Sequence, residues 1–337
     1  MINVVIQGLG FVGSAMAVAV ASILDKKNEP LFNVTGIDIP TGVGRERIDY
    51  INAGEFPFKT GDNKLSHELQ KAVERCNLKA TDNLGEYSQA DIVLVSINCD
   101  LIIQNGLEKI ALDNFTKSIQ DIAENVSEDT LVIIESTVPP GTSEELDVAF
   151  MPEFLTEKNW KDDFKNCDQW ILGSTDPFLY EKMKRMFELA YNNGDGSVVN
   201  KNVIQCKPSE AEMIKYLKNV FLSVKVGFFN ELESICSELD IDYENVRCIA
   251  TQDKRIGTGH TKVPGHDGHR GFGGTCFPKD TNALASFAED NMIPTPILDA
   301  VIKRNEELDR PEKDWTLDKG RAVSAEIKIK KSKKKTK

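Results

Sequence analysis

The sequence lacks a long hydrophobic run. None of its segments approaches the ~18 consecutive apolar residues that a membrane-spanning helix requires. The first residues also lack the basic start and the small-residue cleavage site of a secretory signal peptide. We therefore expect no membrane partner and predict a cytoplasmic location.

Metal-binding and disulfide patterns are missing as well. The 7 cysteines are scattered without a Cys-x-x-Cys pair, and the 4 histidines do not cluster at metal-ligand spacing. We expect reduced thiols, no metal site and no disulfide framework.

Basic residues are fewer than acidic ones, and the formal net charge is −12. An acidic surface repels phosphate, so we expect no nucleic-acid partner.

The chain does have enough residues for two domains, since 337 residues exceed one typical core. In its first part, short apolar runs of β type alternate with segments of helical periodicity. This alternation predicts an α/β fold with a doubly wound parallel sheet, which we assign to residues 1–206. The predicted strands are Ile2–Gln7, Phe32–Asp38, Asp91–Ile97, Leu131–Thr137, Val148–Met151, Gln169–Gly173 and Asn202–Cys206, and the predicted helices include Val12–Leu24 and Leu107–Val126.

The pattern changes at Lys207. Glu210–Leu239 contains no proline and only one glycine, which predicts a long helix that a helical domain or a dimer partner has to bury. A further helical stretch runs from Asp280 to about Arg310. We assign residues 207–310 to a mostly helical central domain, and the lysine-rich residues 311–337 to a solvated, disordered tail. Weak binding of polyanions is the alternative for that tail.

A glycine motif predicts a dinucleotide site. Gly8, Gly10 and Gly13 follow a strand and open a helix, as in a Rossmann domain. They permit a tight turn, close approach of a pyrophosphate and close packing of helix on strand. Asp38, which ends the second strand, can accept hydrogen bonds from ribose hydroxyls and so favours NAD over NADP. The cofactor contacts are predicted at Gly8, Gly10, Phe11, Val12, Gly13 and Asp38, with the alternative that Arg45 and Arg47 turn inward and hold a 2′-phosphate.

The most informative segment is Gly271–Asp280, with the sequence GFGGTCFPKD. Its glycines let the backbone pass close to a ligand. Cys276 follows at once, and nearby positive charge from Lys279 is expected to lower the pKa of its thiol. Asp280 could orient Lys279 or activate a water. We interpret Cys276 as a nucleophile, because structural cysteines usually lie in apolar periodic runs.

Two further groups belong with it. ESTVPPGT at 135–142 and PEFLTE at 152–157 follow consecutive strands, at the edge where ligands bind in open α/β sheets. Lys215 and Asn219 lie four residues apart on the long helix and so share a face. A solvated helix surface is the alternative interpretation of that pair.

Together these motifs resemble the UDP-glucose/GDP-mannose dehydrogenase family. The matching segments, in the family's order within residues 1–310, are GLGFVG, ESTVPPGT, MPEFLTE, the Lys215–Asn219 helix, Arg255-Ile256-Gly257 and GFGGTCFPKD. The resemblance implies NAD-dependent, four-electron oxidation of a nucleotide-sugar C6 alcohol to the carboxylate, with UDP-glucose as the expected substrate. A first hydride leaves an aldehyde, Cys276 forms a thiohemiacetal, a second hydride leaves a thioester, and water hydrolyses it.

The resemblance also implies residue roles and a homodimer formed through the long helix. Thr137, Lys215 and Asp280 would position a water and assist proton transfer, and Lys215 would also stabilise the oxyanion. Glu157 would assist thioester hydrolysis, and Arg255 would reach the sugar nucleotide, either in its own or in a neighbouring subunit. The substrate contacts implied are Glu153, Phe154, Leu155, Lys215, Asn219, Arg255, Gly273 and Lys279, and Thr137 is also placed at the cofactor.

Three features depart from the family pattern. The family has a C-terminal Rossmann-like domain, and too few residues follow Arg310 to build one, which predicts a short form or a domain supplied by another polypeptide. The loop Thr258–His269 is longer than usual, and we interpret its three histidines as surface residues, with substrate contacts as the alternative. Ser96–Asp100 replaces a common Thr-Pro, and Asn159 stands where glycine is usual.

Alternative functions stay open beside a dehydrogenase of UDP-glucose. Another nucleotide sugar, such as a UDP-N-acetylhexosamine or GDP-mannose, is a close variant. A two-electron β-hydroxyacid dehydrogenase shares the domain order but has no use for the Cys276 motif. A non-catalytic or partner-dependent subunit that keeps the fold is the alternative from a different class.

Overall fold

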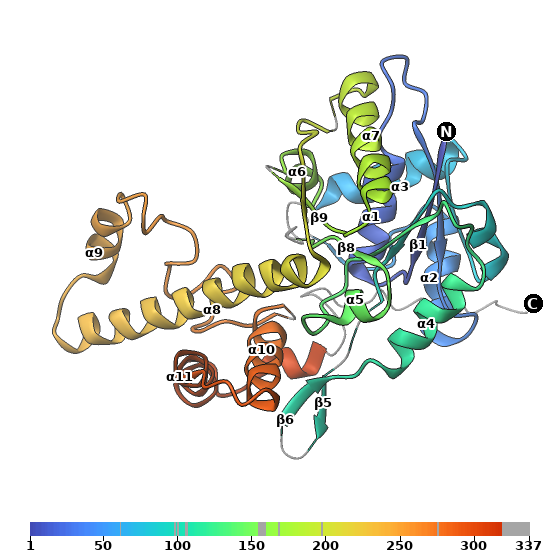
Figure 1. Ribbon diagram of the computed structural model, residues 1–337. Helices are drawn as coiled ribbons and strands as arrows, with labels where there is room; N and C mark the ends of the chain where they lie inside the picture. Colours follow the sequence, from blue (N-terminus) through green and yellow to red (C-terminus); the bar gives the residue numbers. More distant parts are fainter. Residues whose placement is uncertain are drawn as a thin grey trace, which may run out of the picture.

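The computed structural model describes residues 1–60, 62–97, 99, 101–104, 107–153, 160–167, 169–196, 198–274 and 276–318. An α/β layer carries a helical region that projects from one side (Figure 1). The central sheet has eight strands in the order β10 (Val203–Cys206), β9 (Trp170–Gly173), β8 (Ala149–Phe150), β7 (Leu131–Ile134), β4 (Ile92–Val95), β1 (Ile2–Gln7), β2 (Phe32–Ile37) and β3 (Leu78–Thr81).

The strand order creates the edge at which a ligand can bind. β1 pairs in parallel with β2 on one side and with β4 on the other, so the winding reverses between β1 and β4. Ligands of doubly wound sheets bind at the carboxyl ends of the strands beside such a reversal. Gly8, Asp38, Ser96 and Glu135 directly follow β1, β2, β4 and β7, so all four lie at that edge.

Two apolar clusters cover the two faces of the sheet. On one face, α1 (Phe11–Ala21) is buried almost all round, which its run of alanine and valine permits. The other face packs against α4 (Asp113–Ala123) and the start of α8. The remaining elements of the α/β layer are α2 (Gly42–Asn52), α3 (Asn63–Glu74), η1 (Leu84–Gln89), α5 (Thr142–Glu145), α6 (Trp160–Lys165) and α7 (Pro177–Asn193).

The helical region is organised around α8 (Pro208–Glu238), which runs out of the α/β layer (Figure 1). Tyr216 and Val220 of α8 pack with Ala283 in a small apolar cluster. The other elements are α9 (Tyr243–Ala250) near the far end of α8, α10 (Phe277–Asp290), α11 (Pro296–Arg304), a π-helical turn at Asn305–Asp309 and a 3-10 turn at Asp314–Asp318. Within the described residues, no helix combines the length and apolarity needed to cross a bilayer.

One strand pair of the sheet is antiparallel, whereas the prediction was a parallel sheet. β9 lies antiparallel to β8, with Phe150 opposite Gly173, and β10 pairs in parallel with β9. The sheet is therefore mostly parallel rather than wholly parallel. Strand and helix alternation predicts which segments are strands, but it does not by itself give the direction of strands added beyond the parallel core, such as β9 and the edge strand β10.

Three element predictions are wrong in part. Leu107–Ile110 is strand β6, paired in a hairpin with β5 (Leu101–Gln104), and Ile110 packs against the apolar cluster of α8 and α10. The helix predicted from Asp280 is broken, because α10 ends before Pro294 and α11 begins at Pro296. The tail predicted from 311 begins with a 3-10 turn, where Arg310 holds Asp314 through two 2.6 Å hydrogen bonds. Residues 319–337 lie outside the described residues.

Candidate active site

The glycine turn after β1 has the geometry of a pyrophosphate site. Gly8 has φ +91, which disfavours any side chain. A Cβ on Gly13 would lie 1.9 Å from the Gly8 carbonyl oxygen, so α1 and β1 approach as closely as glycine alone allows. A Cβ on Gly10 would meet nothing within 4 Å, which leaves open space at the N-terminus of α1. These features fit a dinucleotide, whose phosphates the free N–H groups and the helix dipole would stabilise.

Asp38 lies beside this turn and is engaged by the backbone. Its Oδ2 accepts the Leu9 N–H at 2.9 Å, and Arg47 lies 3.4 Å from the same oxygen. The charge of Arg47 is therefore met by Asp38, while Arg45 pairs with Asp82 at 2.9 Å. This arrangement favours a ribose over a 2′-phosphate. The side chain of Phe11 packs against Phe56 and Phe58, which leaves its backbone amide for a ligand.

One face of α8 holds the parts of the site together through five side chains that we call the polar stripe. Its members are Glu212, Lys215, Asn219, Ser223 and Asn230, spaced by three, four or seven residues so that they share a face. The stripe bonds to the loop after β7, to α10 and to the glycine loop before Cys276.

The first half of the stripe fixes the loop after β7. Glu212 is buried and accepts the backbone N–H groups of Gly141 at 2.5 Å and Ser143 at 2.8 Å. Lys215 donates from Nζ to the carbonyl oxygen of Glu135 at 2.7 Å. The alternative of a solvated helix surface is wrong for Lys215, which is buried against the loop after β7.

The second half fixes α10 and its acidic residue. Asp280 is 1% exposed, and its Oδ2 accepts Asn219 Nδ2 at 2.6 Å. Its Oδ1 accepts Lys279 Nζ at 2.8 Å. Burial lowers the pKa of Lys279, but the charge of Asp280 and the hydrogen bond to it together raise the pKa by more. The pKa is therefore raised overall, and the ammonium stays charged.

Cys276 is the N-cap residue of α10, and its carbonyl accepts the Asp280 N–H at 2.8 Å. Its side chain reaches solvent. The expectation of a lowered thiol pKa is wrong. Desolvation by the surrounding protein atoms and then the charge of Asp280 raise the pKa of Cys276 to about 11, and Lys279 and Lys215 offset this only in part. The thiol is therefore protonated at rest, and a base has to take its proton when the sulfur reacts.

The glycine loop before Cys276 is held by protein side chains. Asn305 accepts the Phe272 N–H at 2.8 Å and donates to the Phe272 carbonyl at 2.9 Å. A Cβ on Gly271 would lie 2.3 Å from Asn305 Oδ1, and one on Gly273 would lie 2.4 Å from the guanidinium carbon of Arg310. These two glycines thus permit close contact with Asn305 and Arg310. Gly273 has no side chain, so only its backbone N–H and carbonyl could make the predicted contact with substrate.

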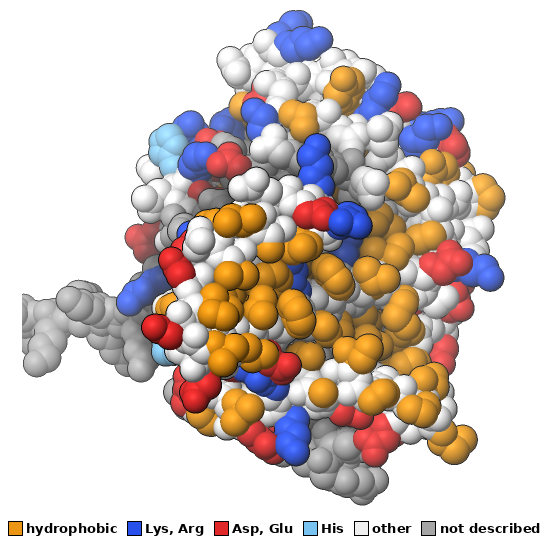
Figure 2. All heavy atoms as spheres, turned by 90° about the vertical axis from the view of Figure 1, so that its left-hand side faces the viewer, with side chains coloured by type: hydrophobic (Ala, Val, Ile, Leu, Met, Phe, Trp, Pro, Cys, Tyr) orange, Lys and Arg blue, Asp and Glu red, His pale blue; other side chains and the backbone are white. Residues whose placement is uncertain are grey.

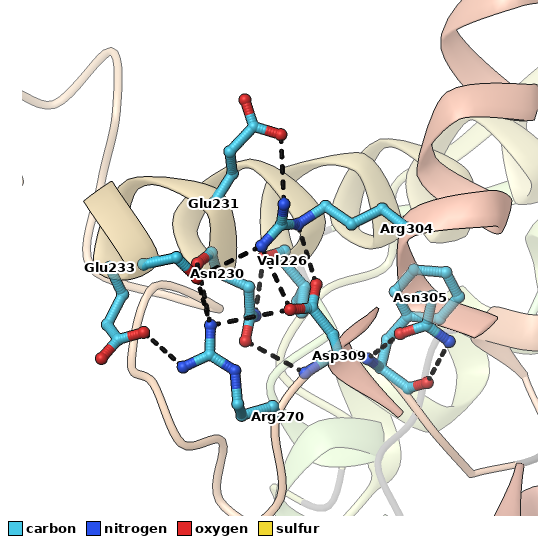
Figure 3. Close-up of polar contacts among 11 residues, drawn as sticks. Val226, Asn230, Glu231, Glu233, Arg270, Arg304, Asn305 and Asp309 are labelled. Atoms are coloured by element: carbon cyan, nitrogen blue, oxygen red, sulfur yellow. Dashed lines mark hydrogen bonds and ion pairs between the residues drawn. The ribbon is translucent and has the colours of Figure 1, made fainter. Parts of the chain in front are cut away.

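A charged network ties the same loop to α8 and to the π-helical turn (Figure 3). Asp309 lies between Arg304, whose Nη2 is 3.1 Å away, and Arg270, whose Nη2 is 3.6 Å away. Arg270 also pairs with Glu233 of α8. Each buried charge has a partner of opposite sign, as burial requires. The network therefore fixes the entry of the chain into the loop that carries Cys276.

Thr137 lies after β7 and Glu153 lies after β8, and both strands end at the ligand edge. Thr137 is buried in the loop that Glu212 and Lys215 hold. Glu153 is close enough to Cys276 and to Glu135 for its charge to raise the pKa of both groups. The predicted residues Phe154, Leu155 and Glu157 lie outside the described residues.

Arg255 is not brought to Cys276 within this chain. Its side chain is 89% exposed and pairs with Asp253 at 2.5 Å. The loop after it does reach the site, because the His260 ring lies 5.5 Å from the ring of Phe277, the residue after Cys276. His260 is nevertheless exposed, as are His266 and His269, which agrees with the surface interpretation of the three histidines. Desolvation by nearby protein atoms, Lys225 and His266 lower the pKa of His260.

Several residues of this site were not assigned roles from the sequence. Glu212 continues the spacing of Lys215 and Asn219 toward the N-terminus of α8, and this periodicity is a signal that could have found it. Glu135 stands beside Thr137 in a motif already singled out. Asn305 and Arg310 follow the motifs by some thirty residues, and no local pattern marks them.

Known proteins resemble the chain over most of its length. UDP-glucose 6-dehydrogenase YwqF of Bacillus subtilis is 31% identical over 321 residues, which cover 90% of this chain and 66% of that protein. A UDP-glucose dehydrogenase from Pyrobaculum islandicum has a TM-score of 0.75 at 27% identity, covering 91% of this chain and 68% of that one. A UDP-D-ManNAc dehydrogenase from Pyrococcus horikoshii, with a TM-score of 0.73 at 22% identity, shares the fold.

The chain thus spans about two thirds of the length of these relatives. Residues 2–191 match the NAD binding domain of one family, and residues 209–307 match its central domain. The match to the first of these domains, which contains the glycine turn, indicates NAD as the cofactor. The chain therefore belongs to the UDP-glucose/GDP-mannose dehydrogenase family.

Proposed function

We propose that this protein oxidises the C6 alcohol of a nucleotide sugar, with UDP-glucose as the first candidate, to the carboxylate and reduces two NAD. The observation that carries the proposal is the cluster around Cys276. Asp280 and Lys279 lie within one turn of the cysteine, Asn219 and Lys215 reach the cluster from α8, and Lys215 bonds to the carbonyl at the end of β7. We also propose that residues 1–206 form the cofactor domain, that residues 207–310 form the central domain, and that the protein is cytoplasmic.

The first oxidation removes a hydride from C6 and a proton from O6, and NAD supplies the hydride acceptor. Thr137, Lys215 and Asp280 would hold a water that receives the proton. Lys215 is buried and already donates one hydrogen bond, so it is fixed in place before the sugar binds. Such fixed charges stabilise a developing oxyanion without having to reorganise.

The second oxidation needs a covalent adduct. The sulfur of Cys276 forms a bond to the aldehyde carbon, and its thiol proton passes by way of the water held by the same groups to the carbonyl oxygen, which becomes a hydroxyl. Loss of a second hydride and of the hydroxyl proton leaves a thioester. Water then attacks the carbonyl with the help of Glu157, the C–S bond breaks and the carboxylate leaves. The adduct keeps the aldehyde in place between the two hydride transfers.

The stoichiometry of NADH tests this proposal. With limiting UDP-glucose and excess NAD, we expect two NADH per sugar, with the uronate as the product identified by mass spectrometry. One NADH per sugar would contradict the four-electron reaction. Turnover of UDP-N-acetylhexosamines or GDP-mannose in place of UDP-glucose would correct the substrate alone. No turnover of any of them, with NAD bound, would favour a subunit that needs a partner or does not catalyse.

We further propose that two copies associate through the face of α8 opposite the polar stripe. Large apolar side chains line that face, which Figure 2 shows as a broad apolar surface. Contiguous apolar surfaces of this kind mark interfaces. A helix face that meets its own copy across a two-fold axis is self-complementary. The exposed members on α8 and just after it are Met213, Leu217, Phe221, Phe228, Ile235, Leu239 and Ile241.

A charged substitution on this face tests the dimer. Phe221 is 61% exposed, and a Phe221→Glu variant is expected to be monomeric, because the interface would bury an unpaired carboxylate. Light scattering coupled to gel filtration measures the mass. Phe178→Glu is the matched control, since Phe178 is 57% exposed on α7 and is expected to leave the mass of the dimer unchanged. A monomeric wild-type protein, or a dimeric Phe221→Glu protein, would refute the proposed interface.

A further inference from the structure

Glu135 is a buried acid to which the proposed reaction gives no role. It is 1% exposed and follows β7, and its N–H still pairs with the carbonyl of Val95 on β4 at 3.0 Å. Its backbone carbonyl accepts the 2.7 Å hydrogen bond from Lys215. Its side chain therefore leaves the sheet at the ligand edge, between the cofactor turn and the catalytic cluster.

The carboxyl group is linked to the cofactor turn through Ser96. Ser96 Oγ donates to Glu135 Oε2 at 2.7 Å. The glycine turn lies directly against Ser96, because a Cβ on Gly8 would be 3.0 Å from the Ser96 carbonyl oxygen and one on Gly13 would be 3.2 Å from its Cβ. A change at Glu135 thus reaches the pyrophosphate-binding turn through one intervening residue.

The surroundings of the other carboxyl oxygen differ from those of Oε2. Glu135 Oε1 is buried and has no hydrogen-bond partner among the residues that the structure describes. A buried carboxylate normally needs partners at both oxygens, because the charge otherwise stays unsolvated. Two charged groups face it, Lys215 from α8 and Glu153 from the segment after β8. Their charges oppose one another.

The balance of these effects brings the titration of Glu135 close to neutrality. Burial raises its pKa most, the hydrogen bond from Ser96 lowers it, Glu153 raises it and Lys215 lowers it, with a result of about 7. The pKa of a carboxyl group is raised in this way when the surroundings favour its neutral form. As the pH rises through the neutral range, a negative charge forms next to the turn.

We propose that Glu135 is a positioning residue of the cofactor site, and that ionisation of its carboxyl group weakens binding of the dinucleotide pyrophosphate through Ser96 and the glycine turn. The neutral acid places no charge there, whereas the carboxylate repels the phosphates that the turn and the helix dipole attract. The inference rests on the proposed function only in that the glycine turn is the site of the cofactor.

Binding of ADP-ribose as a function of pH tests the inference. This probe carries the pyrophosphate without the positive charge of nicotinamide, and calorimetry measures its affinity without any turnover. The wild-type affinity is expected to fall about fivefold as the pH rises through the neutral range, which is a typical size for coupling between two sites. Glu135→Gln, which keeps an acceptor for Ser96 and stays uncharged, is expected to show no such fall.

Two further variants separate this effect from a general loss of structure. Glu153→Gln removes a charge that raises the pKa of Glu135, so the midpoint of the affinity change moves to lower pH. Ser96→Ala removes a hydrogen bond that lowers it and also the contact that links the carboxyl group to the turn, so the midpoint moves to higher pH and the fall in affinity becomes smaller. A wild-type affinity that is constant with pH, a pH dependence that persists in Glu135→Gln, or midpoints that do not move in opposite directions would overturn the inference.

The outcome is separable from that of the proposed function. A protein that binds ADP-ribose with the expected pH dependence but oxidises no nucleotide sugar retains the inference and loses the proposed reaction. A protein that oxidises UDP-glucose with a pH-independent affinity for ADP-ribose retains the reaction and loses the inference.

Discussion

Cys276→Ser is expected to release no uronate above about one part in ten thousand of the wild-type rate, and to form at most one NADH per sugar. The first hydride transfer does not require the sulfur, whereas the second starts from the adduct that the sulfur forms. A serine hydroxyl at this position is a far weaker nucleophile than a thiol. Single-turnover measurement of NADH absorbance, with mass spectrometry of both sugar and protein, distinguishes arrest at the aldehyde from arrest at a covalent ester.

The matched control for this variant is Cys248→Ser. Cys248 is also an exposed, free cysteine, but it lies on α9, away from α10. We expect its NADH stoichiometry to equal that of the wild type. Two NADH per sugar from Cys276→Ser at the wild-type rate would show that the aldehyde is oxidised without the cysteine, for example as its hydrate.

Asp280→Asn is expected to lower the turnover of the enzyme and to raise the reactivity of the Cys276 thiol toward an alkylating agent. Loss of the carboxylate should lower turnover by about 10²- to 10⁴-fold, the usual effect of a group that assists proton transfer. The same change should lower the thiol pKa, since the charge of Asp280 helps to raise it. Alkylation of Cys276 by iodoacetamide at mildly alkaline pH should therefore become about three- to tenfold faster. A variant that merely lost its structure would lose turnover, but all its cysteines would become reactive.

Peptide mass spectrometry follows Cys276 separately from the exposed Cys76 and Cys248. Lys279→Met is the control of opposite sign, because the charge of Lys279 lowers the pKa of the thiol and its removal should slow alkylation. Equal alkylation rates in the wild type and both variants would mean that neither charge acts on the sulfur. Full turnover in Asp280→Asn would remove Asp280 from the proposed proton transfer.

The sequence is sufficient to predict those parts of the site that neighbouring residues determine. The turn at Gly8–Gly13 follows from the need for glycine at a positive φ and at a close helix contact, and both requirements are met in the structure. The pairing of Asn219 with Asp280 joins two motifs that the sequence had already singled out. Recognition of the family also required only the motifs, since these are local in the chain.

Properties that depend on the sum of distant neighbours were not predictable in this way. The pKa of Cys276 is raised because desolvation by the surrounding protein atoms and the charge of Asp280 outweigh two lysines, whereas the prediction from the sequence weighed the charge of Lys279 alone. The strand at Leu107–Ile110 carries a pattern compatible with a helix, and pairing with β5 decides its conformation. Tertiary contacts similarly decide the direction of β9.

The polar stripe and the apolar face lie on opposite sides of α8, so the helix would fix the position of the proposed dimer interface relative to the candidate active site. A helix turns about 100° per residue, so the polar stripe and the apolar face stay in phase only while the residue count between them is kept. A single inserted residue between Lys215 and Asn219 would rotate every later side chain away from its partner. Surface loops can generally change length at small cost, whereas an insertion or deletion within α8 is expected to displace all later contacts of the polar stripe at once.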